Sequence, residues 1–288
     1  MANLKEIRSR ISSVGSTMQI TSAMKMVSAA KLKRAQDAII EMRPYANKLT
    51  ELLKNLSATL DSSSEGVYSA KRPLKNILLV TITSNRGLCG GFNANIIKKT
   101  TTLIQEEYKD AQISILSIGK KSSEYFQKNK FNVISTHDDL FGDLTFDNVS
   151  LVAQQIMNKF KDGEYDQVRL IYNQFKNAAT QIIMNEVFLP VEPEKQEQEN
   201  VIGDYLFEPT KEEIVQQLIP KSLKTQLFKA TLDSHASEHG ARMTAMHKAT
   251  DNAGELKKEL TLTYNKARQA AITGEILEIV GGAEALNN

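Results

Sequence analysis

The chain has 288 residues, with 36 Lys and Arg against 34 Asp and Glu, and 41% of its residues are hydrophobic. This near-neutral balance is not typical of a nucleic-acid binder, and no apolar run approaches the roughly 18 residues that a membrane span needs. A single cysteine, Cys89, excludes an internal disulfide and a four-cysteine metal site. The N-terminus lacks the features of a secretory signal, so we expect a cytosolic or membrane-peripheral chain.

The first segment, residues 4–60, has apolar residues at alternating spacings of three and four, which predicts one long helix of a coiled coil. Between residues 21 and 28 polar residues occupy this seam, and the apolar stripe moves to Ile20, Met24 and Val27. Basic residues cluster beside the break, either as a solvated helix face or as a contact for an acidic partner. Pro44 predicts a slight bend or a turn.

The second segment, residues 74–207, alternates apolar strand-like runs with helical patterns. Such alternation predicts a mostly parallel, Rossmann-like sheet with crossover helices. The acidic stretch at 192–200 reads as a mobile surface loop. The expected strands are 76–83, 113–118, 131–135, 167–172 and 181–189. Three helices are expected: one that starts at Asn93, one at 120–129 and one at 146–161.

The third segment runs from residue 210 to 288, and Pro220 predicts a break between a short helix and a long one at 221–286. Small residues along the long helix allow a second helix to approach closely, and the seam of the first segment supplies that helix. The expected fold class is α/β: a long antiparallel coiled coil of the terminal helices plus a central Rossmann-like domain. The expected domains are 1–60, 74–207 and 210–288.

The last turns of the third segment are apolar nearly all round, from Ile272 to Leu286. A helix that is apolar on every face is normally buried. Either this end folds back on the chain, or it inserts into a partner, and the second reading is favoured because no other part of the chain reaches it.

Two glycine-containing stretches resemble phosphate-binding loops without matching them. In residues 84–93 the glycines do not follow the G-x-G-x-x-G spacing, so a tight strand-to-helix turn capped by Asn93 is favoured over a nucleotide site. The stretch at 119–122 (GKKS) lacks the upstream glycine of a P-loop.

The sequence HASEH at 235–239 matches the H-x-x-E-H pattern of some zinc enzymes. Because it lies in a long alanine-rich helix with no pocket-forming elements around it, a structural or solvent-facing role is favoured. Cys89 has no histidine near it in sequence. The sequence therefore provides no catalytic constellation, no metal site and no cofactor site.

Several motifs resemble the γ subunit of F-type ATP synthase, of the bacterial type, at closely matching spacing across both termini and the middle. They are IRSRI at 7–11, ITSAMKMV at 20–27, RGLCGG at 86–91, SEHGARMTAM at 237–246, ATDNA at 249–253 and YNKARQAAIT at 264–273. The pair Gly240-Ala241 departs from relatives that carry two alanines, and glycine at this point would soften the helix by ~1 kcal/mol.

The resemblance implies a non-catalytic rotor shaft that turns inside a ring of α and β subunits and couples ion flow to ATP synthesis or hydrolysis. The implied partners are α, β, ε and the c ring, with no homo-oligomer and no nucleic acid, on the cytoplasmic face of the bacterial inner membrane. The implied contacts with the ring are Met24, Lys25, Arg242, Arg268, Gln269 and Thr273, and those with ε and the c ring are Tyr205 and Glu208.

Two other classes remain as alternatives. A Rossmann-like enzyme with helical dimerisation arms would bind nucleotide or metal as an isolated chain, and a coiled-coil scaffold would form homodimers. The sequence leaves open whether protons or sodium ions drive the complex, and in which direction it mainly runs.

Overall fold

The structure is a computed structural model that describes residues 4–57, 67–70, 72–191 and 211–286. Their contacts form two compact units. The helix-pair unit contains Met1–Ser28 and Met243–Asn288, and the sheet unit contains Ala29–Arg242. Two long helices, α1 (Leu4–Ser57) and α5 (Lys211–Leu286), each contribute residues to both units.

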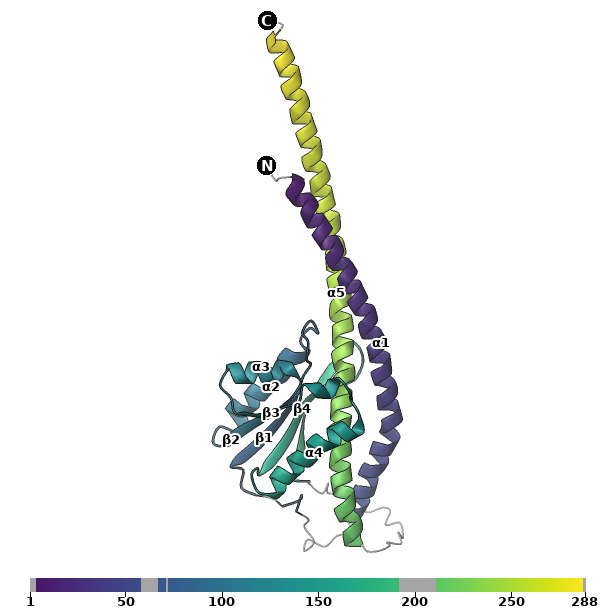
Figure 1. Cartoon of the computed structure of the whole chain (residues 1–288), viewed down its shortest axis with the longest axis vertical. Coiled ribbons are helices and arrows are strands. Elements are labelled where there is room, and N and C mark those ends of the chain that lie inside the picture. The colour runs from purple at the N-terminus through teal and green to yellow at the C-terminus, as the bar shows by residue number, and fades with distance from the viewer. Residues whose placement is uncertain (1–3, 58–66, 71, 192–210, 287–288) are drawn as a thin grey trace. The chain divides into compact units, whose positions relative to one another are not determined.

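In the helix-pair unit, α1 and α5 run antiparallel (Figure 1). Thr250 hydrogen-bonds to Thr21 at 2.8 Å, and a Cβ at Gly254 would lie 3.8 Å from Met18 Sδ. Residues that come later in α5 therefore contact residues that come earlier in α1, as in any antiparallel helix pair. The predicted seam of α1 faces inward: Ile7, Thr21 and Ser28 are all buried, which confirms the three-four spacing.

At the seam break, the second apolar face of α1 is open within this chain. Of the predicted stripe, Ile20 and Val27 are each more than half exposed and Met24 is half-buried, while the polar residues Thr21 and Ser28 take the buried positions. The hydroxyl of Ser28 is satisfied by the carbonyl of Met24 at 2.8 Å, so a polar residue is tolerated in the seam.

The C-terminal end of α5 stays helical to Leu286 and does not fold back. Since Thr250 is level with Thr21, the first described residue of α1, Leu4, is level with the part of α5 near Arg268. Beyond that level the apolar side chains of α5 are uncovered, with 48% to 72% of their surface exposed: Ile272, Ile276, Leu277, Ile279 and Val280.

The sheet unit contains one five-stranded sheet in the order β3-β2-β1-β4-β5. The strands are β1 (Asn76–Ile82), β2 (Gln112–Ile118), β3 (Val133–Thr136), β4 (Gln167–Phe175) and β5 (Gln181–Leu189). The first four are parallel, and β5 returns antiparallel to β4. This confirms the predicted mostly parallel sheet and its returning last strand.

Helices cover both faces of the sheet because its central strands are apolar on both sides. On one face, α4 (Phe146–Lys161) and α5 pack against Leu78, Val80 and Ile82 of β1. On the other face, α2 (Phe92–Thr102) packs against Ile77 and Leu79 (Figure 1). The alternation along β1 shows which residues belong to each layer. The remaining short elements are the π-turn Leu103–Glu107, α3 (Lys120–Lys128) and the 3₁₀ turn Asp139–Phe141.

The prediction of a helix break at Pro220 is wrong. Helix α5 passes through Pro220, as α1 passes through Pro44. A proline inside a helix costs ~3 kcal/mol. Ile219 and Leu223, on either side of Pro220, are buried in the sheet's main hydrophobic core, and this packing offsets the cost. The predicted mobile loop at 192–200 lies outside the described residues.

Candidate functional site: the crevice at the carboxyl ends of the strands

The strand order reverses between β1 and β4. From β1 the chain moves through β2 to β3 on one side, and then returns through α4 to β4 on the other side of β1. In doubly wound folds, ligands bind in the crevice beyond the carboxyl ends of the strands at such a reversal. The residues that follow β1 and β4 are therefore the first place to look for a binding site.

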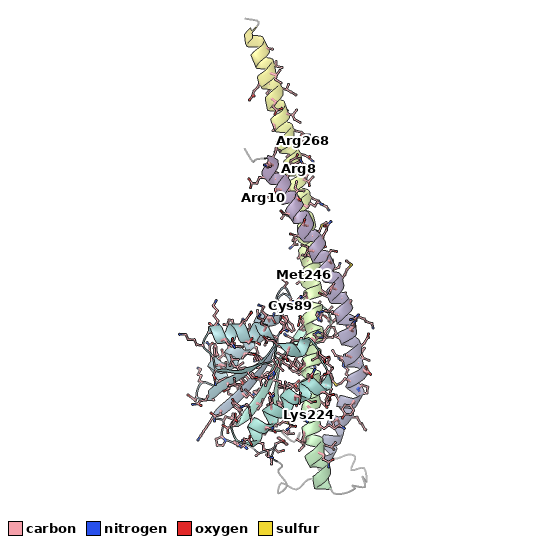
Figure 2. All side chains as sticks on the ribbon, viewed as in Figure 1. Arg8, Arg10, Cys89, Lys224, Met246 and Arg268 are labelled. Carbon is pink, nitrogen blue, oxygen red and sulfur yellow. The ribbon has the colours of Figure 1, made fainter. Side chains whose placement is uncertain are left out.

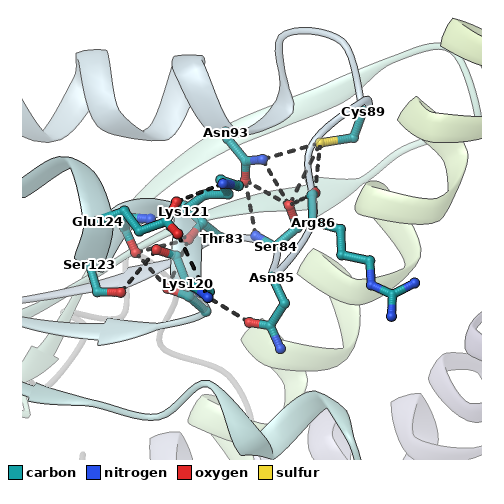
Figure 3. A network of polar contacts seen from close by, with 12 residues as sticks. Thr83, Ser84, Asn85, Arg86, Cys89, Asn93, Lys120, Lys121, Ser123 and Glu124 are labelled. Carbon is teal, nitrogen blue, oxygen red and sulfur yellow. Dashed lines mark hydrogen bonds and ion pairs between the residues drawn. The ribbon is translucent and has the colours of Figure 1, made fainter.

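The start of α3 is occupied by the chain's own acceptors (Figure 3). The backbone N–H of Lys120 donates to Asn85 Oδ1 at 3.0 Å, that of Lys121 to the Ser84 carbonyl at 3.1 Å, and that of Ser122 to Thr83 Oγ1 at 3.0 Å. These amides are the donors that a helix N-terminus would otherwise offer to a phosphate. A phosphate here would have to displace three internal hydrogen bonds.

Gly119 allows this close approach between β1 and α3. It has a φ of +99°, and a Cβ on it would lie 2.0 Å from the carbonyl oxygen of Thr83. Both the backbone conformation and the missing side chain therefore require glycine. The GKKS stretch joins two strand ends tightly and does not form a phosphate cradle.

The prediction that Asn93 caps α2 is wrong. Helix α2 begins at Phe92 with Gly91 as its N-cap and no side-chain cap. The amide of Asn93 instead ties the loop to the end of β1, because its Oδ1 accepts from the backbone N–H of Ser84 at 2.9 Å and its Nδ2 donates to Cys89 Sγ at 3.2 Å. Cys89 is buried, and burial raises the pKa of its thiol.

Helix α5 fills the crevice between β1 and β4. Ser237 Oγ donates to the carbonyl of Asn173 at the end of β4, at 3.0 Å. Arg242 Nη2 donates to the carbonyls of Arg86 and Gly87 in the loop after β1, at 3.0 and 3.4 Å. The place where related folds hold a ligand is thus taken by side chains of this helix.

The H-x-x-E-H motif lies in this buried part of α5, so a solvent-facing role is wrong and the structural one is correct. Glu238 pairs with Arg242, and the Nε2 atoms of His235 and His239 lie 3.1 Å apart. Desolvation lowers the pKa of His235 to about 4 and that of His239 to about 3, so both rings are neutral near pH 7.

The orientation of the histidines opposes a metal between them. Arg242 Nη1 lies 3.4 Å from His239 Nδ1, and because a guanidinium only donates, Nδ1 must accept. The neutral ring then carries its proton on Nε2 and donates it to His235, so this nitrogen has no lone pair for a metal. Among the described residues, no three His, Cys, Asp or Glu side chains are grouped to hold a metal ion.

The residues expected to contact partners are found in different environments. Met24 and Lys25 are half-buried in the helix-pair unit, whereas Arg268, Gln269 and Thr273 are exposed. Figure 2 shows Arg268 near the same end of the helix pair as Arg8 and Arg10. Arg242 is buried by its own chain. Tyr205 and Glu208 lie outside the described residues.

Residues 231–240 of α5 are buried on nearly every side although this part of the helix is rich in polar residues, and the sequence pattern did not predict this burial. A helix buried all round is usually apolar, so hydropathy alone did not indicate it. The feature of the sequence that could have indicated this burial is the mixture of small and polar residues without a charged outer face. The buried polar residues of this part are Thr231, Asp233, Ser234, Ser237, Glu238 and His239.

The fold thus combines an antiparallel helix pair with a sheet unit in which side chains of α5 occupy the crevice at the strand ends. The chain matches the ATP synthase family model over residues 3–286. It is 64% identical over 287 residues to the ATP synthase gamma chain of Flavobacterium johnsoniae, with 100% of both chains covered. It is 44% identical over 290 residues to that of Chlorobaculum tepidum, with 99% of each covered.

Solved structures agree with the fold. The central stalk and c-ring structure of Tetrahymena thermophila mitochondrial ATP synthase matches with a TM-score of 0.60 at 27% identity, covering 80% of this chain and 99% of that one. The rotor of the Euglena gracilis mitochondrial enzyme matches with a TM-score of 0.68 at 22% identity, covering 93% and 98%. The chain belongs to the ATP synthase γ-chain family, whose members form the rotor shaft of F-type ATP synthase.

Proposed function

We propose that this chain is the non-catalytic central shaft of a bacterial ATP synthase, turning inside a ring of α and β subunits and held at its other end by ε and the c ring. The observation that carries the proposal is the uncovered apolar end of α5, where five large apolar side chains are about half exposed or more. Isolated exposed apolar residues are ordinary, but a contiguous apolar helix end marks a surface that a partner covers.

An apolar end suits a shaft because hydrophobic contact has no preferred direction. An apolar helix surface can turn against an apolar collar without breaking specific hydrogen bonds. A charged end would have to exchange ion pairs at each step of rotation. The collar that this requires would be formed by the α and β subunits.

Unlike the apolar end, the sides of the helix pair would make contacts that differ with the angle of rotation. A single chain has no rotational symmetry, so it meets each subunit of a ring with a different face. The seam break provides such a difference, because Ile20 and Val27, seven residues apart, form an exposed apolar patch on one side of α1. A face that contacts only one catalytic conformation of β stabilises it, and turning the shaft then shifts the open and closed populations.

The proposed contacts with the ring are Met24 and Lys25 beside this patch, and Arg268, Gln269 and Thr273 toward the apolar end. Arg242 also belongs to the proposed contact set by resemblance, but its side chain faces its own chain, so it would act on the ring through the residues it holds. Tyr205 and Glu208 are the proposed contacts with ε and the c ring.

The proposed location is the cytoplasmic face of the bacterial inner membrane, as a peripheral subunit. Within the part of the chain that the structure describes, no helix combines the length and the hydropathy needed to cross a bilayer. Attachment would then come from the c ring and ε.

The experiment that tests the proposal is native mass spectrometry of the chain co-expressed with its α and β subunits, with ATPase activity measured on the same sample. We expect one copy of the chain in each α/β ring, and no ATPase activity from the chain alone. A free homodimer that binds nucleotide and does not associate with α or β would overturn the proposal in favour of an enzyme.

A variant sharpens this test. Lys25→Glu reverses a charge at the seam break, and we expect it to lower ATP-driven ion pumping while assembly and folding stay normal. Lys161→Glu is the matched control, because it reverses an exposed charge on α4, which belongs to the sheet unit. Normal pumping by Lys25→Glu at normal assembly would count against a contact at this position.

A further inference from the structure

The side chain of Arg242 connects two parts of the chain that are 156 residues apart. Its Nη1 pairs with Glu238 Oε1 at 2.5 Å, and both side chains keep only 10% of their surface exposed. Its Nη2 reaches the carbonyls of Arg86 and Gly87. One guanidinium thus uses its fork of donors to hold helix α5 to the loop between β1 and α2.

The loop that Arg242 holds, residues 86–91, is strained. Leu88 has a φ of 62°, and Gly90, which as a glycine adopts this region without strain, has a φ of 59°. The left-handed conformation costs an ordinary residue about 1–2 kcal/mol, and such strain persists only where surrounding contacts enforce it. The strain has no packing reward at Leu88 itself, because 65% of its side chain is exposed.

The contacts that enforce this conformation converge on one atom. The carbonyl oxygen of Arg86 accepts from Ser84 Oγ at 2.6 Å and from Arg242 Nη2 at 3.0 Å, and Cys89 Sγ lies 3.9 Å from it. Ser84 and Cys89 lie in or next to the loop, so their contacts with this oxygen bend it, and Asn93 of α2 ties both of them to the end of β1. Arg242 supplies the attachment to α5.

Contacts with neighbouring side chains of α5 hold the guanidinium of Arg242 in its position. Glu238 neutralises its charge, His239 accepts from it, and His235 stacks on Phe141 at 5.8 Å between ring centres. A buried charge left unpaired is costly, so the ion pair and the carbonyl contacts depend on each other. Glu238 and Arg242 are four residues apart on one helix, which fixes their geometry.

We propose that Arg242 is a positioning residue that fastens the strained 86–91 loop to α5, so that the loop and the helix move as one rigid piece when the helix turns. The loop would otherwise relax around Leu88 and absorb part of the twist. The mechanical part of this inference rests on the proposed function, whereas the structural part concerns this chain alone.

The structural part is tested on the full-length chain through its single thiol. Cys89 lies inside the fastened loop and is buried, so its alkylation by iodoacetamide under native conditions reports opening of the loop. We expect Arg242→Gln to raise the alkylation rate by about tenfold, which corresponds to ~1.4 kcal/mol of opening free energy. Lys248→Gln, which removes an exposed charge further along α5, should leave the rate unchanged.

Arg242→Lys separates charge from shape. Lysine keeps a positive charge near Glu238 but has a single nitrogen in place of the fork, so we expect an intermediate rate. A wild-type rate in a folded Arg242→Gln chain would overturn the proposal. If that variant fails to fold by circular dichroism, Arg242→Lys decides, and a wild-type rate there would overturn it equally.

The mechanical part is tested in the assembled complex in vesicles. We expect Arg242→Lys to lower the number of ions pumped per ATP hydrolysed, because a loosened loop transmits less of the rotation. Faster alkylation with unchanged pumping per ATP would overturn the mechanical part. Failure of the wild-type chain to assemble with α and β would instead reject the proposed function, and the alkylation result would still stand.

Discussion

Thr250 donates a hydrogen bond to Thr21 across the helix pair, with their hydroxyl oxygens 2.8 Å apart inside a largely apolar seam. The hydroxyl of Thr21 in turn donates a hydrogen bond to the carbonyl oxygen of Met18 at 3.1 Å. Polar residues in a coiled-coil seam commonly fix the register of the two helices at a cost in stability. This pair lies where the apolar stripe of α1 leaves the seam, so it holds the register at its weakest point.

Replacing Thr21 with valine should change stability little. Valine keeps the shape of threonine, and Thr250 keeps an acceptor because its hydroxyl also lies 2.8 Å from the carbonyl of Met246. No buried donor is left unpaired, so we expect the free energy of unfolding in urea to change by less than about 1 kcal/mol. Thr17→Val, at an exposed position of the same helix, serves as the control. A loss of more than about 2 kcal/mol would show that the hydroxyl pair is a net stabilising contact.

The elements that could be predicted from sequence are those whose signal is local. The seam of α1 and the strands follow from periodicity, and helix α4 has the predicted bounds Phe146–Lys161. The predictions that were wrong concern features that depend on residues distant in sequence. The helix α5 continues through Pro220, for example, because Ile219 and Leu223 pack on the sheet. Similarly, nothing near Arg242 in the sequence indicates the carbonyl of Arg86, so the filled crevice could not be foreseen.

Two glycines of α5 should respond in opposite ways to alanine. A Cβ at Gly254 would meet Met18 Sδ at 3.8 Å, an ordinary contact, so Gly254→Ala should gain the helix propensity of alanine, ~1 kcal/mol. A Cβ at Gly240 would lie 3.1 Å from the Cα of Ala178, in the turn between β4 and β5. Gly240→Ala should therefore lower the melting temperature while Gly254→Ala raises it.

Gly240 was expected to soften the helix, but its closeness to Ala178 shows that it lets the β4–β5 turn lie directly against α5. If Gly240→Ala were as stable as Gly254→Ala, the turn would have to move aside freely, and close packing would not be the reason for glycine.

Asp233 should destabilise the fold at neutral pH. Its Oδ1 is buried without a hydrogen-bond partner, and desolvation raises the pKa of its carboxyl to about 6 despite the nearby Lys229 and Arg43. Between pH ~4 and ~6 the folded chain holds a proton that the unfolded chain has lost, so stability falls as the pH rises through this window. A shift of about two pKa units corresponds to at most about 3 kcal/mol.

Asp233→Asn removes this titration. We expect its unfolding free energy at pH 7 to exceed that of the wild type, with the difference shrinking toward pH 4. Asp110→Asn, at an exposed turn, provides the control. A variant less stable than the wild type at pH 7 would mean that the charged carboxylate has a favourable interaction that outweighs its burial.

The histidine pair should give the opposite pH dependence. Desolvation is the main cause that lowers the pKa of His239 to about 3 and that of His235 to about 4, so below pH ~6.5 the unfolded chain binds protons that the folded chain does not. Stability then falls as the pH decreases, by up to ~1.4 kcal/mol per pH unit for each ring. Between pH ~4 and ~6 Asp233 offsets one of the two rings.

His239→Gln should therefore flatten the decline of stability between pH 6.5 and 4, measured by urea unfolding at a series of pH values. His247→Gln is the matched control, because His247 is an exposed residue on the same helix, paired with Asp251 at 3.3 Å. Adding His239→Gln to Asp233→Asn should flatten the decline in the same way, because the other shifted groups, His235, His137 and Glu238, are present in both chains. A double variant whose stability declines as steeply as that of Asp233→Asn alone would show that His239 has the same pKa in the folded and unfolded chains, so that burial does not hold its ring neutral.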